Sequence, residues 1–266
     1  MSEDNEKCLP TDITKNAPHA DDEVMPRGLY ISMKKKGQYA IKCEIAIRVV
    51  TYYIKDFDAV LLDAGSTAEI IAEEMFKQRK FLSVLTNNMG AYVEYTRARA
   101  GKFSVSNDNE LLITGGRYAD MYESLFGKDA IASISDFTPN VTIIGTSGIR
   151  YGEGIFCHGT EDSAVKQLLL TKPTDIRLIA ADWTKIGSRD AHSFGTAEQL
   201  SLNAKQAVVV TSEIPRKVHD EDPERAREFE NQIQMMKKNN IEVIKVKIPE
   251  VKNKNEENHK QTKGEN

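Results

Sequence analysis

Residues 59–76 read AVLLDAGSTAEIIAEEMF, and this stretch decides the fold. The apolar run Ala59–Leu62 has the length and branched side chains of a strand that is buried on both faces, and it stops at Asp63. From Ala68 onward, apolar residues recur at the three- and four-residue intervals of a helix that packs one side against a sheet. The stretch therefore predicts a strand, a tight turn and a helix.

The turn between this strand and this helix is a candidate anion site. Its residues Gly65, Ser66 and Thr67 lie where unpaired backbone N–H groups and the positive end of the helix dipole point outward, which suits a phosphate. The alternative is an ordinary helix cap, in which Ser66 or Thr67 accepts a backbone hydrogen bond and Gly65 relieves a strained φ. The turn alone does not decide between the two.

Strand-like runs and helical patterns alternate along the rest of the chain. The further runs that we interpret as strands lie at residues 82–86, 141–145, 176–181, 207–211 and 241–247. Helical spacing is found at residues 37–54, 162–170 and 223–238. This alternation predicts an α/β fold with a Rossmann-like, parallel or mostly parallel sheet and helices on both faces. Two short runs at 103–106 and 111–114 could pair as a hairpin or merely adjoin.

The composition is that of a globular chain with polar ends. Of 266 residues, 40% are hydrophobic and 29% are charged, with a net charge of −4, which is enough for one substantial core. We expect residues 1–34 to be a disordered acidic tail, residues 35–248 to form the folded domain, and residues 249–266 to be a disordered C-terminal tail. Since the acidic excess lies in the first 25 residues, the body is nearly neutral, which argues against a strongly basic nucleic-acid surface.

The sequence gives no indication of a membrane, metal or cofactor. No run approaches the ~20 apolar residues of a membrane span, and the N-terminus is too polar for a secretory signal, so we expect a cytoplasmic protein. Cys8, Cys43 and Cys157 are too far apart for a C-x-x-C metal pair and too few for a disulfide framework. We therefore expect neither a metal nor a cofactor.

Polar residues follow four of the predicted strands, at the end of an open α/β sheet where ligands bind. After the turn at 63–67 come Asn87, then Gly145 and Ser147, and finally Lys185. Each has a structural alternative, because Asn87 could cap the helix that follows it and Lys185 could form a surface pair with a neighbouring acid. Four such places at strand ends nevertheless predict one polar pocket.

Two acidic residues at a helix start, Glu161 and Asp162, belong to the same set of candidates. Asp162 has a simple structural interpretation, since a carboxylate favours a helix N-terminus and Lys166 follows four residues later. This interpretation requires no ligand.

Six short motifs occur in an order that resembles the C-terminal effector domain of DeoR-type transcriptional regulators. They are Asp63-Ala-Gly-Ser-Thr67, Leu85-Thr-Asn-Asn88, Leu112-Ile-Thr-Gly-Gly116, Leu125-Phe-Gly127, Ile144-Gly-Thr-Ser-Gly-Ile149 and Ala181-Asp-Trp-Thr-Lys-Ile-Gly187. The likeness covers about residues 35–247. It implies a fold like that of ribose-5-phosphate isomerase and a domain that binds a phosphorylated sugar or related metabolite.

Position by position, the resemblance implies roles for the candidate residues. Gly65, Ser66 and Thr67 would form the phosphate cradle, Asn87 and Ser147 would lie near the sugar, and Lys185 would be a second anchor. The complete set of expected ligand-binding residues is Asp63, Gly65, Ser66, Thr67, Asn87, Gly145, Ser147, Asp162 and Lys185. DeoR-type regulators usually have a glutamate where this chain has Asp162, with Glu161 one position earlier, so which carboxylate faces the pocket stays open.

The resemblance does not extend to a DNA-binding module. A winged helix-turn-helix needs about 55–60 residues before the effector domain, whereas about 34 polar residues precede it here. We therefore expect a sensor domain that does not bind DNA directly and that acts alone or with a separate regulator. The family likeness also implies a homo-oligomer.

An enzyme is the alternative from a different class. An aldose–ketose sugar-phosphate isomerase needs a carboxylate base and groups that hold the phosphate and polarise the carbonyl. Glu161 or Asp162, with Lys185 and the 65–67 turn, could supply that set. The isomerases, however, show an acidic cluster after the strand that corresponds to 141–145, where this chain has Thr-Ser-Gly. This difference favours binding over catalysis.

Overall fold

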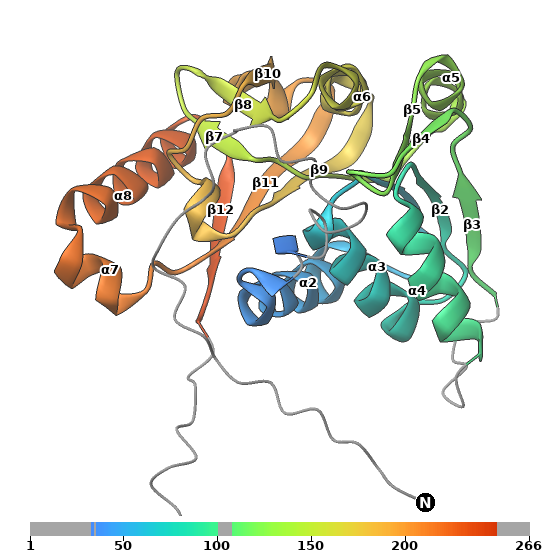
Figure 1. Ribbon diagram of the computed structural model, residues 1–266, viewed down its shortest axis with the longest axis horizontal. Helices are drawn as coiled ribbons and strands as arrows, with labels where there is room; N and C mark the ends of the chain where they lie inside the picture. The colour runs from blue at the N-terminus through green and yellow to red at the C-terminus, as the bar shows by residue number, and fades with distance from the viewer. Residues whose placement is uncertain (1–32, 35, 101–107, 249–266) are drawn as a thin grey trace, which may run out of the picture.

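The computed structural model describes residues 33–34, 36–100 and 108–248. Within this part of the chain, seven strands form one sheet in which all neighbours are parallel, in the order β12-β11-β9-β6-β1-β2-β3 (Figure 1). The strands are β1 Ala59–Leu62, β2 Ser83–Thr86, β3 Glu110–Ile113, β6 Val141–Ile144, β9 Thr174–Ala180, β11 Ala204–Ser212 and β12 Glu242–Val246. The predicted tails at 1–32 and 249–266 lie outside the described residues.

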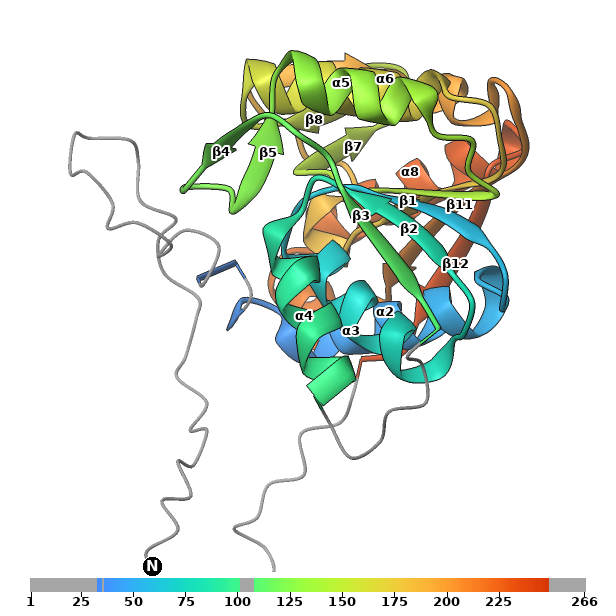
Figure 2. The ribbon, with the colours of Figure 1, turned by 90° about the vertical axis from the view of Figure 1, so that its right-hand side faces the viewer.

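Helices cover both faces of this sheet, as Figures 1 and 2 show. One face packs on α2 Tyr39–Tyr53, α3 Ser66–Gln78 and α4 Met89–Ala100. The other face packs on α5 Lys128–Asp136, α6 Thr160–Thr171 and α8 Pro223–Lys238, which follows the short helix α7 Arg216–Glu221. Successive side chains of β1 point to opposite faces of the sheet and so contribute to a hydrophobic core on each face: Val60 and Leu62 pack on the side of α2, α3 and α4, and Leu61 packs on the side of α5, α6 and α8. The predicted Rossmann-like α/β fold is confirmed.

Short strands outside the main sheet are the principal elements that the sequence patterns missed. A hairpin joins β4 Arg117–Ala119 to β5 Ser124–Phe126, and a second small sheet contains β7 Gly148–Arg150, β8 Gly154–Cys157 and β10 His192–Gly195. At three or four residues each, these strands are too short for apolar alternation to stand out. The run at 111–114 overlaps β3, which pairs in parallel with β2, while the run at 103–106 lies outside the described residues.

The strand order places a topological switch point between β1 and β6. From β1 the chain proceeds outward through β2 and β3, and then returns to β6 on the other side of β1. The loops that leave β1 and β6 therefore diverge from each other, and the crevice between them is where open α/β sheets bind ligands.

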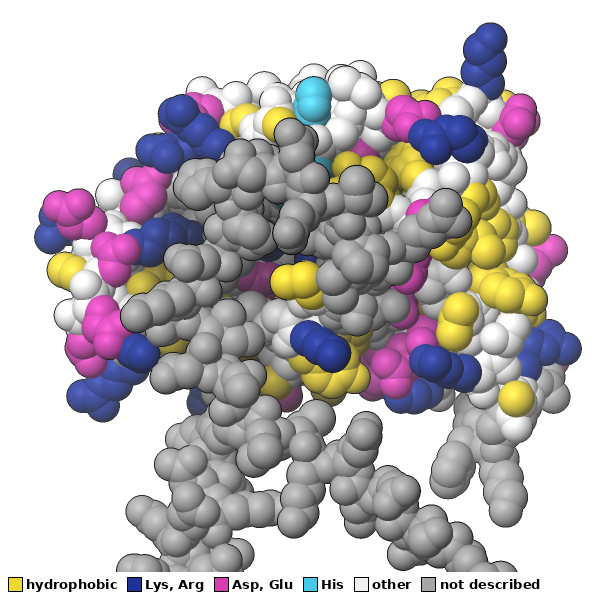
Figure 3. All heavy atoms as spheres, viewed as in Figure 1, with side chains coloured by type: hydrophobic (Ala, Val, Ile, Leu, Met, Phe, Trp, Pro, Cys, Tyr) yellow, Lys and Arg dark blue, Asp and Glu magenta, His cyan; other side chains and the backbone are white. Residues whose placement is uncertain are grey.

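Large exposed hydrophobic side chains occur together on one side of the molecule. Tyr92 and Val93 of α4, Leu112 of β3 and Tyr118 of β4 are all more than one-third exposed, and hydrophobic side chains gather on that side in Figure 3. The homo-oligomer stays a prediction, and this surface is the one that we would expect it to bury. None of the described helices is long and apolar enough to cross a membrane.

Candidate functional site

A pocket of about 250 Å³ opens at the carboxyl ends of β1, β6 and β9. Its wall contains the turn after β1, the loop that begins at Gly145 after β6, and the loop from Ala181 to Lys185 after β9. Helix α6, the segment at the start of α2, the β4–β5 hairpin and the end of β8 also contribute to it. Pockets that hold drug-sized ligands span roughly 300–1,000 Å³, so this volume suits a compact metabolite.

The N-terminus of α3 faces this pocket without a side-chain cap. Helix α3 begins at Ser66, and its N-cap residue Gly65 has a φ of +118° and ψ of 164°, a conformation essentially restricted to glycine. Among the described residues, no side chain caps this helix start; the Ser66 hydroxyl instead accepts a hydrogen bond from Lys42 Nζ at 3.2 Å. The first-turn N–H groups are therefore available to a ligand, as an anion site requires.

Four lysines line the pocket: Lys34, Lys42, Lys166 and Lys185. Burial lowers the pKa of Lys42 to about 8, although the nearby Asp182 carboxylate acts in the opposite direction. Burial also lowers the pKa of Lys34 to about 7, and the positive charges of Lys185 and Lys166 add to this effect. An anion would relieve this repulsion, because it favours the protonated form of each lysine.

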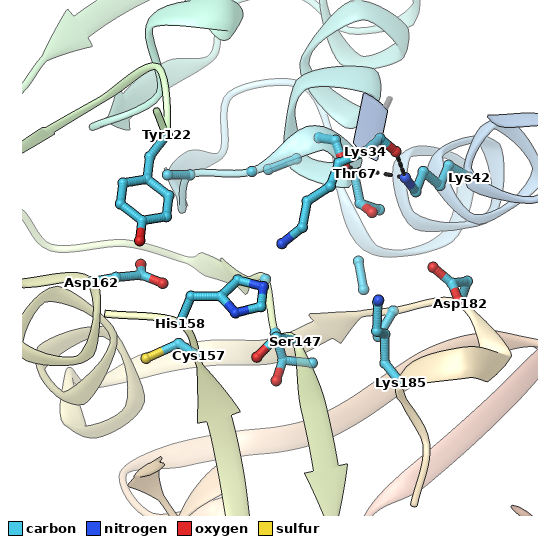
Figure 4. A pocket seen from close by; sticks show the side chains of 18 of the residues that line it. Lys34, Lys42, Thr67, Tyr122, Ser147, Cys157, His158, Asp162, Asp182 and Lys185 are labelled. Atoms are coloured by element: carbon cyan, nitrogen blue, oxygen red, sulfur yellow. Dashed lines mark hydrogen bonds between the residues drawn. The ribbon is translucent and has the colours of Figure 1, made fainter. Parts of the chain in front are cut away.

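Figure 4 shows how the labelled side chains are arranged around the cavity. Lys34 and Lys42 lie beside Thr67, and Lys34 projects into the cavity toward His158. Tyr122 and Asp162 lie on the opposite side. The pocket thus has a lysine side, which includes the α3 N-terminus, and a side with a hydroxyl, a carboxylate and an imidazole.

Lys166 forms ion pairs with two carboxylates. Its ammonium pairs with Asp63, whose side chain is fully buried, and lies 3.2 Å from Asp162 Oδ1. Burial opposes its charge, but Asp162 and Asp63 together raise the pKa of Lys166 above its ordinary value. Asp63 Oδ2 also accepts a hydrogen bond from Gly145 N at 2.9 Å. This cluster ties α6 to the ends of β1 and β6 beneath the pocket.

An imidazole–carboxylate pair lies at the base of the cavity. His158 Nδ1 is 2.5 Å from Asp190 Oδ2. Burial, reinforced by the charge of Lys34, lowers the pKa of His158, which favours the neutral ring. Burial would raise the pKa of Asp190, but the Ser147 hydroxyl, the Ala191 N–H and His158 together lower it. A neutral imidazole held by a carboxylate can exchange hydrogen bonds with a sugar hydroxyl.

The structure brings most of the predicted ligand-binding residues to this pocket. The lining includes Gly65, Ser66, Thr67, Gly145, Ser147, Asp162 and Lys185. It also settles which carboxylate faces inward: Asp162 lines the pocket, whereas Glu161 is half exposed and pairs with Arg117 on the surface. The Lys185 ammonium forms no ion pair with any described residue, so its predicted surface pairing with Asp182 is absent there.

Two predicted residues lie behind the pocket wall. Asp63 is buried beneath it, where its carboxylate accepts hydrogen bonds from Lys166 Nζ and Gly145 N. Asn87 is 2% exposed, and its Nδ2 donates to the carbonyl oxygen of Leu125 at 3.2 Å, which fastens the β4–β5 hairpin. Neither Asp63 nor Asn87 is among the residues that line the cavity, and their direct contact with a ligand stays a prediction; both position residues that do line it.

Four residues of the pocket carry no strand-end signal in the sequence and were not predicted: Lys34, Lys42, Tyr122 and His158. Lys42 lies within a helical pattern, in which a lysine is expected on the solvent-exposed side of the helix. Lys34 lies in a run of three lysines, which gives no reason to select one of them. The nearest signal was the glycine-rich loop that contains His158. Within the described part of the chain, no group of three or more His, Cys, Asp or Glu residues could hold a metal ion.

Comparison with known proteins gives relatives among transcriptional regulators. The chain is 25% identical over 143 residues to the HTH-type transcriptional regulator GlpR of Haloferax volcanii, an alignment that covers 54% of this chain and 52% of the relative. It is 27% identical over 190 residues to the lactose phosphotransferase system repressor of Staphylococcus aureus strain N315, with coverage of 71% and 69%. The chain thus spans about half the length of the first of these relatives.

Among solved structures, ribose 5-phosphate isomerase A from Methanocaldococcus jannaschii overlaps 56% of this chain and 55% of that chain, with a TM-score of 0.38 and 11% identity. This overlap is too loose to bear on function.

The decisive match is to a family model, that of the DeoR C terminal sensor domain, which matches residues 37–204. These residues include the main-sheet strands from β1 to β9, the loops that follow them, and helices α2 to α6. Because the match covers more than half of the chain, the protein belongs to the DeoR C-terminal sensor domain family.

Proposed function

We propose that this domain is an effector sensor that binds a phosphorylated sugar or a closely related phosphorylated metabolite. The observation that carries the proposal is the lysine side of the pocket, where the uncapped N-terminus of α3 lies beside Lys42 and faces the cavity that Lys185 also lines. Backbone N–H groups, a helix dipole and lysine ammonium groups together form a site for a phosphate dianion.

The polarity of the pocket supports one orientation of such a ligand. The phosphate would lie against Gly65, Ser66 and Thr67, between Lys42 and Lys185. The sugar hydroxyls would then point toward Asp162, Tyr122 and His158, on the other side of the cavity. Phenol and imidazole groups can donate hydrogen bonds to sugar hydroxyls and accept them, and a carboxylate accepts them, whereas the negative charge of the Asp162 carboxylate would repel a second phosphate.

The proposed role is regulatory, in keeping with the family and with relatives that are named as regulators and repressors. Binding would change how the domain acts on a DNA-binding partner, whether that partner is a separate regulator or another segment of chain. The nature of the sugar would be decided by the hydroxyl contacts of Asp162 and His158.

Calorimetric titration with ribose 5-phosphate and fructose 6-phosphate, each compared with the same sugar lacking its phosphate, tests the proposal. We expect binding that requires the phosphate and is weakened about tenfold or more by Lys42→Met, because that variant removes a buried ammonium at the cradle. Lys77→Met is the matched control, since Lys77 is an exposed lysine on α3, far from its N-terminus. Equal affinity for sugars with and without phosphate would contradict the proposal.

The same samples test the alternative of an aldose–ketose isomerase. Glu161 lies on the surface, so Asp162 is the carboxylate in the pocket that could serve as the base. Its Oδ1 lies 3.2 Å from Lys166 Nζ. Conversion of ribose 5-phosphate to its ketose isomer that is lost in Asp162→Asn would establish catalysis. Binding without conversion supports the sensor.

A further inference from the structure

We infer that Lys34 is a phosphate ligand supplied by the segment that enters the domain, and that effector binding clamps this segment onto the pocket. The inference rests on the proposed function and adds to it the means by which occupancy of the pocket is transmitted. The segment consists of the described residues 33, 34 and 36–38, immediately before α2.

The position of the segment is the first observation. Lys34, Gly37 and Gln38 all line the pocket, so the chain reaches α2 along the cavity wall. Gly37 N donates to Met33 O at 3.0 Å, and Lys42 N donates to Gln38 O at 2.9 Å, so a helical turn leads directly into the N-cap of α2 at Gln38. Movement of this segment therefore moves one wall of the pocket.

The second observation is that one lysine bridges the segment and the phosphate cradle. Lys42 Nζ donates both to the carbonyl oxygen of Lys34 and to the Ser66 hydroxyl at the start of α3. A phosphate bound at the cradle would sit next to this ammonium. The segment, Lys42 and the cradle are thus joined before any ligand arrives.

The third observation concerns charge. The Lys34 side chain extends into the cavity toward His158, as Figure 4 shows, and both lysines (Lys185, Lys166) and carboxylates (Asp190, Asp162) act on its charge. Burial is the main reason that the pKa of Lys34 falls to about 7, and the positive charges of Lys185 and Lys166 lower it further, while Asp190 and Asp162 act in the opposite direction. A phosphate dianion placed among these groups favours the protonated form of Lys34 and draws its ammonium inward.

The consequence is a coupling between the pocket and the chain that precedes the domain. When the pocket binds an anion, Lys34 contributes a charge-assisted hydrogen bond and residues 36–42 become less mobile. By thermodynamic reciprocity, a partner that holds this segment in place would raise the affinity for the effector. A change confined to the pocket thereby becomes a change in how the chain enters the domain.

Hydrogen exchange measured by mass spectrometry tests this inference, with inorganic phosphate as the probe. In the unmodified protein, phosphate should slow exchange both in the first turn of α3 and in residues 37–42. In Lys34→Gln, phosphate affinity should fall about tenfold, and at saturating phosphate the α3 turn should be protected while residues 37–42 are not. Lys34→Arg should retain both effects, and Lys36→Gln, which changes an exposed lysine two residues away, should behave like the unmodified protein.

The outcomes separate the two proposals. Protection of the α3 turn without protection of residues 37–42 in the unmodified protein would overturn the clamp while leaving the phosphate site intact. The clamp would also be wrong if Lys34→Gln bound phosphate as tightly as Lys36→Gln does. If phosphate neither binds nor protects the α3 turn, the proposed phosphate site itself fails.

Discussion

The buried pair between Asp63 and Lys166 leads to a prediction that does not depend on the identity of the ligand. Asp63 is fully buried, and the Lys166 side chain is 5% exposed, so neither charge is screened by water. Removing one partner of such a pair usually costs about 3–5 kcal/mol in the free energy of unfolding, because the other charge is left buried. We expect both single variants, Asp63→Asn and Lys166→Met, to be strongly destabilised.

The surrounding contacts place each variant within that range. In Asp63→Asn the amide oxygen can still accept a hydrogen bond from Gly145 N, and Lys166 still has Asp162 at 3.2 Å. We therefore expect this variant to lose about 3 kcal/mol in the free energy of unfolding. In Lys166→Met the Asp63 carboxylate loses its cation and keeps one backbone donor, so we expect this variant to lose about 4 kcal/mol in the free energy of unfolding. For a domain of this size, a loss of 3 kcal/mol lowers Tm by about 6–12 °C.

The double variant distinguishes this reasoning from a simple loss of packing. Asp63→Asn/Lys166→Met leaves neither of these two charges behind, so its cost should be well below the sum of the single variants, with a coupling of about 2 kcal/mol or more. Urea denaturation of the unmodified protein, the two single variants and the double variant gives the four free energies of this double-mutant cycle. Lys77→Met is the control, since the Lys77–Glu73 pair is exposed and contributes less than about 0.5 kcal/mol. Strictly additive costs, or single variants no worse than this control, would refute the argument.

Two further predictions concern the phosphate site. Since the pKa values of Lys42 and Lys34 are about 8 and 7 and a phosphate binds their protonated forms, affinity for ribose 5-phosphate should fall as pH rises from about 6.5 to 8.5, and Lys42→Met should flatten the titration profile. A pH-independent affinity over that range would contradict the role of these lysines. Gly65→Ala should lower the free energy of unfolding by about 1–3 kcal/mol and weaken ligand binding, because the backbone at φ +118° is strained for alanine even though its Cβ would meet no atom within 4 Å. Urea denaturation measures the loss of stability, and calorimetry measures the loss of affinity. An unchanged stability would show that the turn can relax.

The main sheet could be predicted from the sequence because its strands are buried on both faces. Such strands read as continuous apolar runs, and β1 occupies the very residues 59–62 that the pattern indicated. Helix α3 begins at Ser66, two residues before the first apolar residue of its stripe, because the first turn faces the pocket rather than the core. The small strands β7 and β8 were missed because a hairpin of three- and four-residue strands is too short to show apolar alternation, and β10 was missed because its pairing depends on a fold that brings residues 192–195 to β8.

The site was only partly predictable, for a related reason. Strand-end residues such as Ser66 and Lys185 could be identified because a parallel sheet collects them at one edge. The same rule selected Asp63, but whether a strand-end carboxylate meets the ligand or a buried cation depends on Lys166, which lies 103 residues away in the sequence. Lys34 and Lys42 follow no strand, so their contribution depends on how α2 packs against α3, and no local pattern carries that information.

The distribution of charge explains why a pocket with four lysines would discriminate between a phosphorylated sugar and a bare one. Lys166 is balanced by Asp63 and Asp162, so it stabilises the fold without attracting an anion. Asp182 is occupied by the backbone N–H and the hydroxyl of Thr184, while neither Lys42 nor Lys185 forms an ion pair with any described residue. The uncompensated positive charge therefore lies at the α3 N-terminus. A bare sugar could fill the hydroxyl side of the pocket but would leave this charge unmatched, so the favourable free energy of binding should depend on the phosphate.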